Sequence, residues 1–159
     1  MAKYQKFDEV PVWQEASRLY ERVLDLLEES NLPLTPNFRN QLDRAALSVL
    51  NNIAAGSERM GSSETLSLLG MALNSAVDVQ SMMAVASQRP KLARFTEVLK
   101  AIRGLAESCA RQLGAWMAAF TNPQRGSKRP AGGPEEGVDQ PSAKGGGDHF
   151  QRKPGTYRQ

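Results

Sequence analysis

A regular apolar repeat occupies the stretch before the glycine-rich C-terminal part of the chain. Nine apolar side chains recur alternately three and four positions apart: Leu92, Phe95, Leu99, Ile102, Ala106, Cys109, Leu113, Trp116 and Phe120. This spacing places all nine on one side of an α-helix through about four heptads. Such a seam is buried by packing against other helices at a crossing angle of about 20°. The repeat therefore predicts a long helix in an all-α bundle.

Proline and glycine divide the preceding sequence into three further helices. The first runs from Pro11 to about Glu29, the second from Pro36 to about Arg59, and the third from about Ser63 to Ser87. Thr35 suits the N-cap of the second helix and Gly61 its C-terminal stop, while Ser62 or Ser63 suits the N-cap of the third. In the first helix the predicted seam is Trp13, Ala16, Tyr20, Val23 and Leu27. We expect an up-down antiparallel four-helix bundle.

The composition changes abruptly after residue 121. Residues 122–159 hold 8 of the 13 glycines and 5 of the 9 prolines, with few aromatic or branched side chains. They cannot bury enough apolar surface to offset the entropy of ordering, so a disordered tail is predicted. Residues 1–121 contain 13 Lys/Arg and 13 Asp/Glu, whereas the tail contains 7 and 4. The whole net charge of +3 therefore belongs to the tail.

The second predicted helix has two distinct sides. Its core-facing stripe is Phe38, Leu42, Ala45, Ala46, Val49 and Ile53. A separate, largely polar row is Arg44, Ser48, Asn52, Ala55 and Arg59. Positions three and four apart lie on one helix face, so the row should form a continuous strip with a guanidinium at each end.

This helix also carries a family resemblance. The residues concerned are Asp43-Arg44-Ala45-Ala46, Ser48-Val49, Asn52-Ile53-Ala54, Gly56 and Arg59, with Val12-Trp13-Gln14-Glu15-Ala16 in the first helix. Over residues 7–120 the chain resembles the four-helix-bundle proteins encoded in intervening sequences of bacterial large-subunit ribosomal RNA genes. It also resembles the accessory variability proteins of diversity-generating retroelements. The resemblance implies a ring-shaped homo-oligomer, such as a pentamer, and as partners a reverse transcriptase and its template RNA.

The chain departs from the pattern of that family in two respects. Ala55 stands where the family usually carries glutamate, and the third helix is poorer in glutamate than the family's. If such carboxylates pair with arginines across a subunit interface, Asp78 must serve that purpose alone here.

The third predicted helix is apolar nearly all round, with only Glu64 and Asp78 charged before Arg89. One face would hold Leu66, Leu69, Leu73, Ala76, Val77 and Ala84, and the other Leu68, Ala72, Val79, Met82 and Ala86. A small monomeric bundle cannot bury both, so we expect an oligomer. The candidate interface residues are Leu47, Leu50, Leu68, Ala72, Asp78, Val79 and Met82. The alternative is a helix that is simply central and crowded.

Catalytic chemistry finds little support in the sequence. The only histidine, His149, lies in the predicted tail, where nothing orients it as a base. Metal-ligand clusters and phosphate-binding glycine motifs are lacking, and Cys109 lies on an apolar seam as a packing residue. We therefore predict a protein that is not an enzyme and needs no cofactor or metal. The N-terminus has no apolar signal region, so a cytoplasmic protein without a membrane span is expected.

The cationic side chains are the candidate functional residues. Those proposed to bind RNA or DNA are Arg44, Arg59, Arg89, Lys91, Arg94, Arg103, Arg125, Lys128 and Arg129. Arginine matches phosphate geometry, and ring symmetry would multiply each cation by the number of subunits. The competing interpretation makes Arg44 and Asn52 structural, through ion pairs and hydrogen bonds within the bundle.

Two function classes remain from the sequence. The first is a homo-oligomeric helical scaffold that binds nucleic acid and a partner protein. The second is a purely structural oligomer or protein–protein adaptor without nucleic-acid binding, which the neutral charge of residues 1–121 favours.

Overall fold

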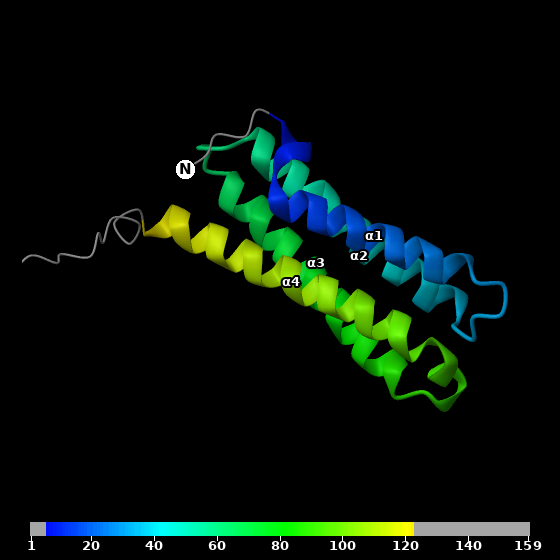
Figure 1. Cartoon of the computed structure of the whole chain (residues 1–159). Helices are drawn as coiled ribbons and strands as arrows, with labels where there is room; N and C mark the ends of the chain where they lie inside the picture. Colours follow the sequence, from blue (N-terminus) through cyan, green and yellow to red (C-terminus); the bar gives the residue numbers. More distant parts are fainter. Residues whose placement is uncertain (1–5, 123–159) are drawn as a thin grey trace, which may run out of the picture. The chain divides into compact units, whose positions relative to one another are not determined.

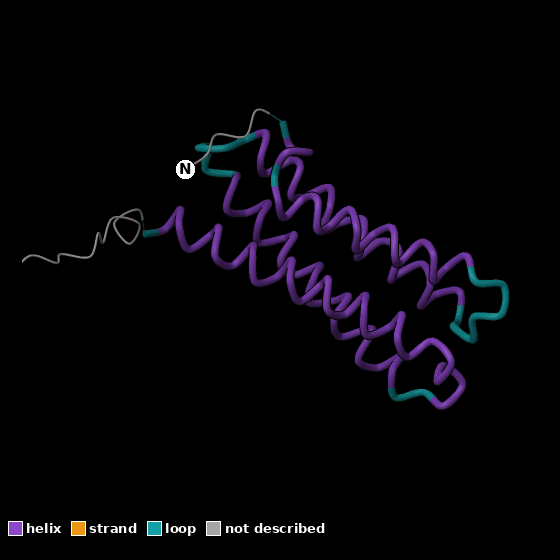
Figure 2. The backbone as a smooth tube through the Cα atoms, viewed as in Figure 1, coloured by secondary structure: helices purple, strands orange, loops and turns teal. Residues whose placement is uncertain are grey.

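The computed structural model describes residues 6–122 and consists of helices joined by short connections (Figures 1 and 2). The elements in chain order are η1 (Phe7–Glu9), α1 (Pro11–Glu28), α2 (Pro36–Glu58), α3 (Thr65–Ser87), η2 (Pro90–Phe95) and α4 (Thr96–Thr121). The α-helices match the four predicted from the sequence. Residues 123–159, which are all of the predicted tail except Asn122, lie outside the described part of the chain.

The four long helices form an up-down antiparallel bundle. α1 packs along α2 and α4, and α3 also packs along α2 and α4, so α1 and α3 are diagonal to each other. The α1–α2 and α3–α4 connections lie at one end, and the start of α1 and the end of α4 lie at the other (Figure 1). We call these the loop end and the terminal end. The predicted fold class is confirmed.

The core of the bundle follows the repeat that the sequence predicted for α4. The buried residues of this seam are Leu92, Phe95, Leu99, Ile102, Ala106, Cys109 and Leu113. Trp116 and Phe120 continue it as partly buried residues. The first two belong to η2, so the seam begins in a 3₁₀ turn rather than in α4 itself.

The seam of α1 differs from the predicted one. The buried residues are Val12, Ala16, Leu19, Val23 and Leu26, whereas the predicted Trp13, Tyr20 and Leu27 are only partly buried. The two sets share Ala16 and Val23 and differ by a small rotation of the helix. Trp13 and Tyr20 lie at the edge of the bundle instead.

The two predicted faces of α3 are also wrong in detail. The buried face is Thr65, Leu69, Ala72, Ala76, Val79, Met83 and Ala86, a single heptad stripe. Val77, which the sequence placed on one face with Leu69 and Ala76, is 49% exposed, whereas those two are completely buried. Ala72 and Val79, proposed as interface residues, are completely buried within the subunit and cannot reach a second copy.

The helix ends follow the predicted signals in part. Thr35 caps α2, accepting a hydrogen bond from the Phe38 amide at 3.2 Å, and Gly61 has a left-handed φ of 88°. The predicted serine cap of α3 is absent, because α3 begins at Thr65 and its N-cap position makes no side-chain bond. The Thr65 hydroxyl instead donates to the carbonyl of Arg59, which ties the start of α3 to the end of α2.

Small residues bring α2 and α3 into close contact. Gly56 is buried, and a Cβ atom placed on it would lie 3.1 Å from Cδ2 of Leu69. That separation is well inside ordinary carbon–carbon contact. Leu69 is itself completely buried, so it has little room to move away. The close approach of the two helices therefore depends on glycine at position 56.

Two glycine-to-alanine variants test this contact. Gly104→Ala, in α4 with nothing near its missing Cβ, should raise the free energy of unfolding by about 0.5–1 kcal/mol through helix propensity. Gly56→Ala makes the same chemical change but compresses Leu69, so it should be less stable than Gly104→Ala by about 1 kcal/mol or more. Urea unfolding followed by circular dichroism measures both. Equal stabilisation by the two changes would show that the α2–α3 contact is loose.

Candidate nucleic-acid interface

The middle of the polar row on α2 faces α3 rather than open solvent. The Ser48 and Ser75 hydroxyl oxygens lie 2.8 Å apart across the two helices. The Asn52 amide nitrogen donates to the Ser48 carbonyl at 2.9 Å and to its hydroxyl at 3.0 Å, and Ser75 donates to the Met71 carbonyl at 2.9 Å. These bonds form one chain from α2 into α3. Ser48 and Asn52 therefore have structural partners, which the competing interpretation proposed for Asn52.

Arg44, at one end of the row, is different. It is exposed and has no ion pair or hydrogen bond with any described residue. The predicted pairing of Arg44 with a neighbouring carboxylate does not occur. The adjacent Asp43 accepts a hydrogen bond from the Tyr20 hydroxyl at 3.0 Å, between α2 and α1. Asn40, Asp43 and Arg44 line a shallow depression of about 280 Å³.

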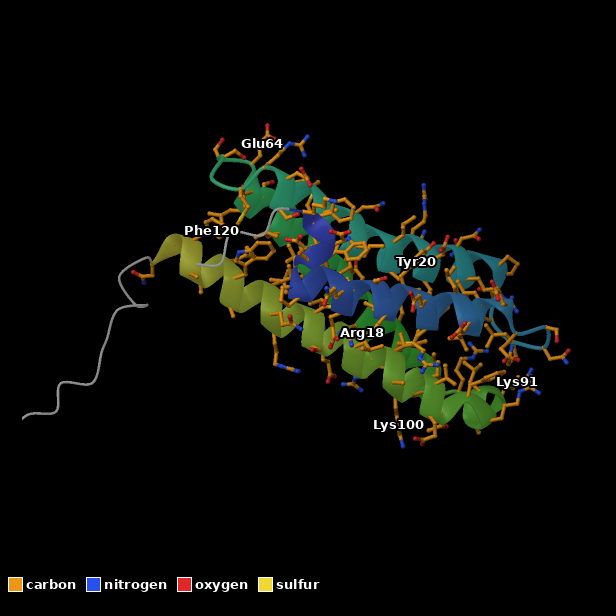
Figure 3. The ribbon with its side chains drawn as sticks, turned by 45° about the horizontal axis from the view of Figure 1, so that its top comes forward. Arg18, Tyr20, Glu64, Lys91, Lys100 and Phe120 are labelled. Carbon is orange, nitrogen blue, oxygen red and sulfur yellow. The ribbon has the colours of Figure 1, made fainter. Side chains whose placement is uncertain are left out.

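Arg59, at the other end of the row, is already paired. Its Nε atom lies 3.2 Å from the Glu64 carboxylate, which sits at the N-cap position of α3. Both side chains are more than half exposed, so the pair contributes little to stability and can exchange partners. Figure 3 shows Glu64 at the terminal end, projecting away from the bundle.

Three of the candidate cations lie close together at the loop end. Arg89 and Lys91 are exposed and have no ion-pair partner among the described residues, and Arg94 follows three residues later. The Arg94 guanidinium donates to the Asn31 carbonyl at 2.7 Å and lies 4.6 Å from the centre of the Phe95 ring. Figure 3 shows Lys91 at this end, opposite Phe120. We call Arg89, Lys91 and Arg94 the cationic corner.

The cations on the outer face of α4 are mostly neutralised. Lys100 pairs with Glu97 at 3.1 Å, and Arg103 pairs with Glu107 at 3.0 Å, both within the helix. Arg103 is therefore a weaker candidate for phosphate binding than the cationic corner. The remaining candidates, Arg125, Lys128 and Arg129, lie outside the described residues.

One arginine that the sequence did not single out has a clear structural role. Arg39, in the second turn of α2, donates to the Leu27 carbonyl at 3.2 Å and to the Leu32 carbonyl at 2.7 Å. Arg94 donates to the Asn31 carbonyl in the same connection. Two guanidinium groups thus satisfy carbonyls at the end of α1 and in the connection that follows it. The only sign of this role in the sequence is the position of Arg39, four residues after the Thr35 cap.

The outward side of α3 exposes three large apolar side chains among polar ones such as Asn74 and Ser81. Met71, Val77 and Val85 are 47%, 49% and 54% exposed, and Asp78 is the only charged residue between Thr65 and Ser87. Of the proposed interface residues, Leu47, Leu50, Leu68 and Met82 are partly buried and Asp78 is exposed. These five remain accessible to a neighbouring molecule.

By length and composition alone, α3 could also cross a membrane, and it is the one such helix among the described residues. A core helix passes the same test, so this carries little weight. The relevant fact is that only 28% of its most apolar stretch is buried inside the bundle. The sequence expectation that no segment is apolar enough to span a membrane is thus too strict for α3.

The single cysteine has the environment of a packing residue. Cys109 is completely buried, and burial, followed by the negative charge of Glu15, raises the pKa of its thiol to about 12. A thiol of this kind is almost entirely protonated near neutral pH and is a poor nucleophile. Within residues 6–122, no group of three His, Cys, Asp or Glu side chains could hold a metal ion.

The Tyr20–Asp43 hydrogen bond can be tested by Tyr20→Phe. At pH 7 the change should lower the free energy of unfolding by about 1 kcal/mol. Burial, then the hydrogen bond to Asp43 and its negative charge, raises the tyrosine pKa above its ordinary 10.0. The stabilising contribution is therefore present below pH 10 and lost as the pH rises through the folded-state pKa. Urea unfolding at pH 7 and pH 10.5 should show the two proteins converging, and a constant difference would contradict this assignment.

Comparisons with known proteins give one clear result. Residues 8–115, which run from η1 to about two turns before the end of α4, match the model of the 23S rRNA-intervening sequence protein family. The comparison with curated proteins and the comparison with solved structures each found no match. The matched segment covers well over half of the chain and includes the whole of α2 and α3. The chain therefore belongs to the 23S rRNA-intervening sequence protein family.

Proposed function

We propose that this protein is a non-enzymatic, homo-oligomeric scaffold of the cytoplasm that binds RNA and a partner protein. The observation that carries the proposal is the separation of two surfaces on one bundle. Exposed apolar side chains lie on α3, and cations without an ion pair lie at the cationic corner. The first surface suits self-association and the second suits phosphate.

Self-association follows from the apolar side chains that α3 leaves in water. Burying apolar surface contributes about 25 cal/mol per Å², and contiguous exposed patches of this kind mark interaction sites. Asp78 is exposed in the middle of the α3 face, and Arg44 is unpaired on neighbouring α2. Each of these two charges is therefore available to pair with a second copy. Asp78 would do this alone, because α3 has no glutamate. A ring, such as the pentamer implied by the family resemblance, would bury this face in every subunit.

RNA binding follows from the cations that remain unpaired. Arg89 and Lys91 can bind phosphate without first breaking an ion pair, in contrast to Lys100 and Arg103. Three cations on one subunit give only weak, salt-dependent binding. Repeating the corner around a ring would increase the number of phosphate contacts and raise the affinity through multivalency.

The partner protein is the least constrained part of the proposal. The resemblance to accessory variability proteins makes a retroelement reverse transcriptase, together with its template RNA, the specific partner to test. The two proteins can be co-purified from cells that express both, with and without nuclease treatment. An association that survives nuclease is a direct protein contact, and one that is lost was bridged by RNA.

A purely structural oligomer is the second candidate. The equal numbers of acidic and basic residues in positions 1–121 favour it, as do the ion pairs of Arg59, Lys100 and Arg103. This candidate predicts the same assembly without RNA binding. The two variants described next therefore test the assembly and the RNA surface separately.

Val85→Glu tests the assembly. Light scattering at micromolar concentration should give a multiple of the 17.4 kDa subunit mass for the natural protein and a smaller mass for the variant. A carboxylate at this exposed position would have to be desolvated in the interface. The matched control is Val98→Glu on α4, where valine is 37% exposed and the mass should not change. A monomeric natural protein would refute the oligomer.

Arg89→Gln combined with Lys91→Gln tests the RNA surface. Fluorescence anisotropy with a labelled structured RNA across a salt series should show affinity falling about tenfold and the salt slope falling by about 2. The control pair is Lys100→Gln with Arg103→Gln, which removes the same charge from paired residues. Equal losses in both would mean nonspecific attraction. No binding by the natural protein at low salt would leave the structural oligomer as the function.

A further inference from the structure

A second depression lies at the terminal end of the bundle, far from the cationic corner. It has a volume of about 280 Å³ and is open to solvent on one side. Its lining comes from the start of α1 and the last turns of α4: Val10, Pro11, Val12, Gln112, Ala115 and Trp116. Figure 1 shows these two helix ends together, where the described chain begins and ends.

The lining is mostly apolar and offers one polar side chain. The Gln112 amide nitrogen donates to the Ser108 hydroxyl at 3.3 Å, which fixes the side chain and leaves its oxygen as an acceptor. Trp116 is only partly buried and packs against Phe120, with ring centres 6.3 Å apart. The Trp116 ring is thus accessible from the depression and is restrained by Phe120, so it can pack against an apolar group of a ligand.

An unpaired cation stands beside this depression. Arg111 is exposed, lies one helical turn before Ala115, and has no ion pair or hydrogen bond with the described residues. Glu15, on neighbouring α1, is taken by Arg18 at 3.0 Å. The guanidinium is therefore available to an anion placed next to the depression.

We propose that this depression docks the partner protein through a bulky apolar side chain seated against Trp116, with a nearby carboxylate bound by Arg111. The proposal rests on the partner-binding half of the proposed function. An enclosed pocket would suit a free metabolite, because small-molecule sites bury most of the ligand. An open, apolar depression with a single cation suits a peptide segment better than it suits RNA. Trp116 lies one residue beyond the family match, and the rest of the lining lies within it.

The two tryptophans of the chain, Trp13 and Trp116, allow a site-specific test. The full-length protein is labelled with 5-fluorotryptophan and observed by ¹⁹F NMR, and Trp13→Phe identifies the Trp116 resonance. The probe is an acetylated and amidated alanine–glutamine peptide that carries one phenylalanine and, four residues later, one glutamate. We expect a saturable shift of the Trp116 resonance, with Trp13 unmoved. The two control peptides replace the phenylalanine by alanine or the glutamate by glutamine.

Three protein variants separate the two halves of the site. Ala115→Phe fills the depression and should weaken peptide binding at least tenfold. Arg111→Gln should weaken it about threefold, the size expected for an exposed ion pair. The control, Arg103→Gln, removes another exposed cation of α4 about two turns earlier, one that is paired with Glu107, and should leave binding unchanged. Circular dichroism verifies that each variant keeps its helix content.

The outcomes distinguish this site from the proposed function as a whole. No Trp116 shift at millimolar peptide, or equal shifts with the phenylalanine and alanine peptides, overturns the docking site. Equal binding of the glutamate and glutamine peptides overturns the role of Arg111. A Trp116 shift on adding RNA would assign the site to nucleic acid instead. RNA anisotropy on the same samples reports the proposed RNA binding, which Ala115→Phe should not affect.

Discussion

The close approach of α2 and α3 determines how the rest of the bundle is arranged. Gly56 leaves room for Leu69, and the Ser48–Ser75 hydrogen bond joins the two helices near their middle. Helices that pack this closely through small residues fill the space between them with backbone and short side chains. Leu69 of α3 is completely buried at this contact, whereas Met71 and Val85 lie on the outer surface of the helix.

The same contact explains which polar residues are available for function. Ser48 and Asn52 lie at the α2–α3 seam and satisfy each other, so they hold the register of the two helices. Arg44, one turn earlier, has no such partner. At the loop end, Arg39 and Arg94 bind carbonyls of the α1–α2 connection. Residue type alone does not separate structural from available cations, since arginines occur in both groups.

The sequence predicts the bundle well because its strongest signals are local. The heptad spacing in α4, the Thr35 cap and the left-handed Gly61 each depend on residues a few positions apart. The face of α3 was mispredicted because that helix is apolar nearly all round, and periodicity cannot choose among apolar positions. Ala72 and Val79 were therefore placed on the wrong side. The role of Asn52 depends on Ser75, which lies in the next helix and is invisible to spacing within α2.

Each candidate site on this small bundle should bind its ligand only weakly. Binding therefore depends on how many copies of the site the assembly provides. One subunit offers three cations at its corner and one open depression with one guanidinium, each exposed to water and salt. Within a closed ring, each of these groups recurs once per subunit at fixed spacing. An RNA that contacts several corners at once gains affinity without any new type of contact. In the proposed oligomer the few unpaired cations of a neutral bundle are repeated, and the exposed apolar side chains of α3 are the surface proposed to join the copies.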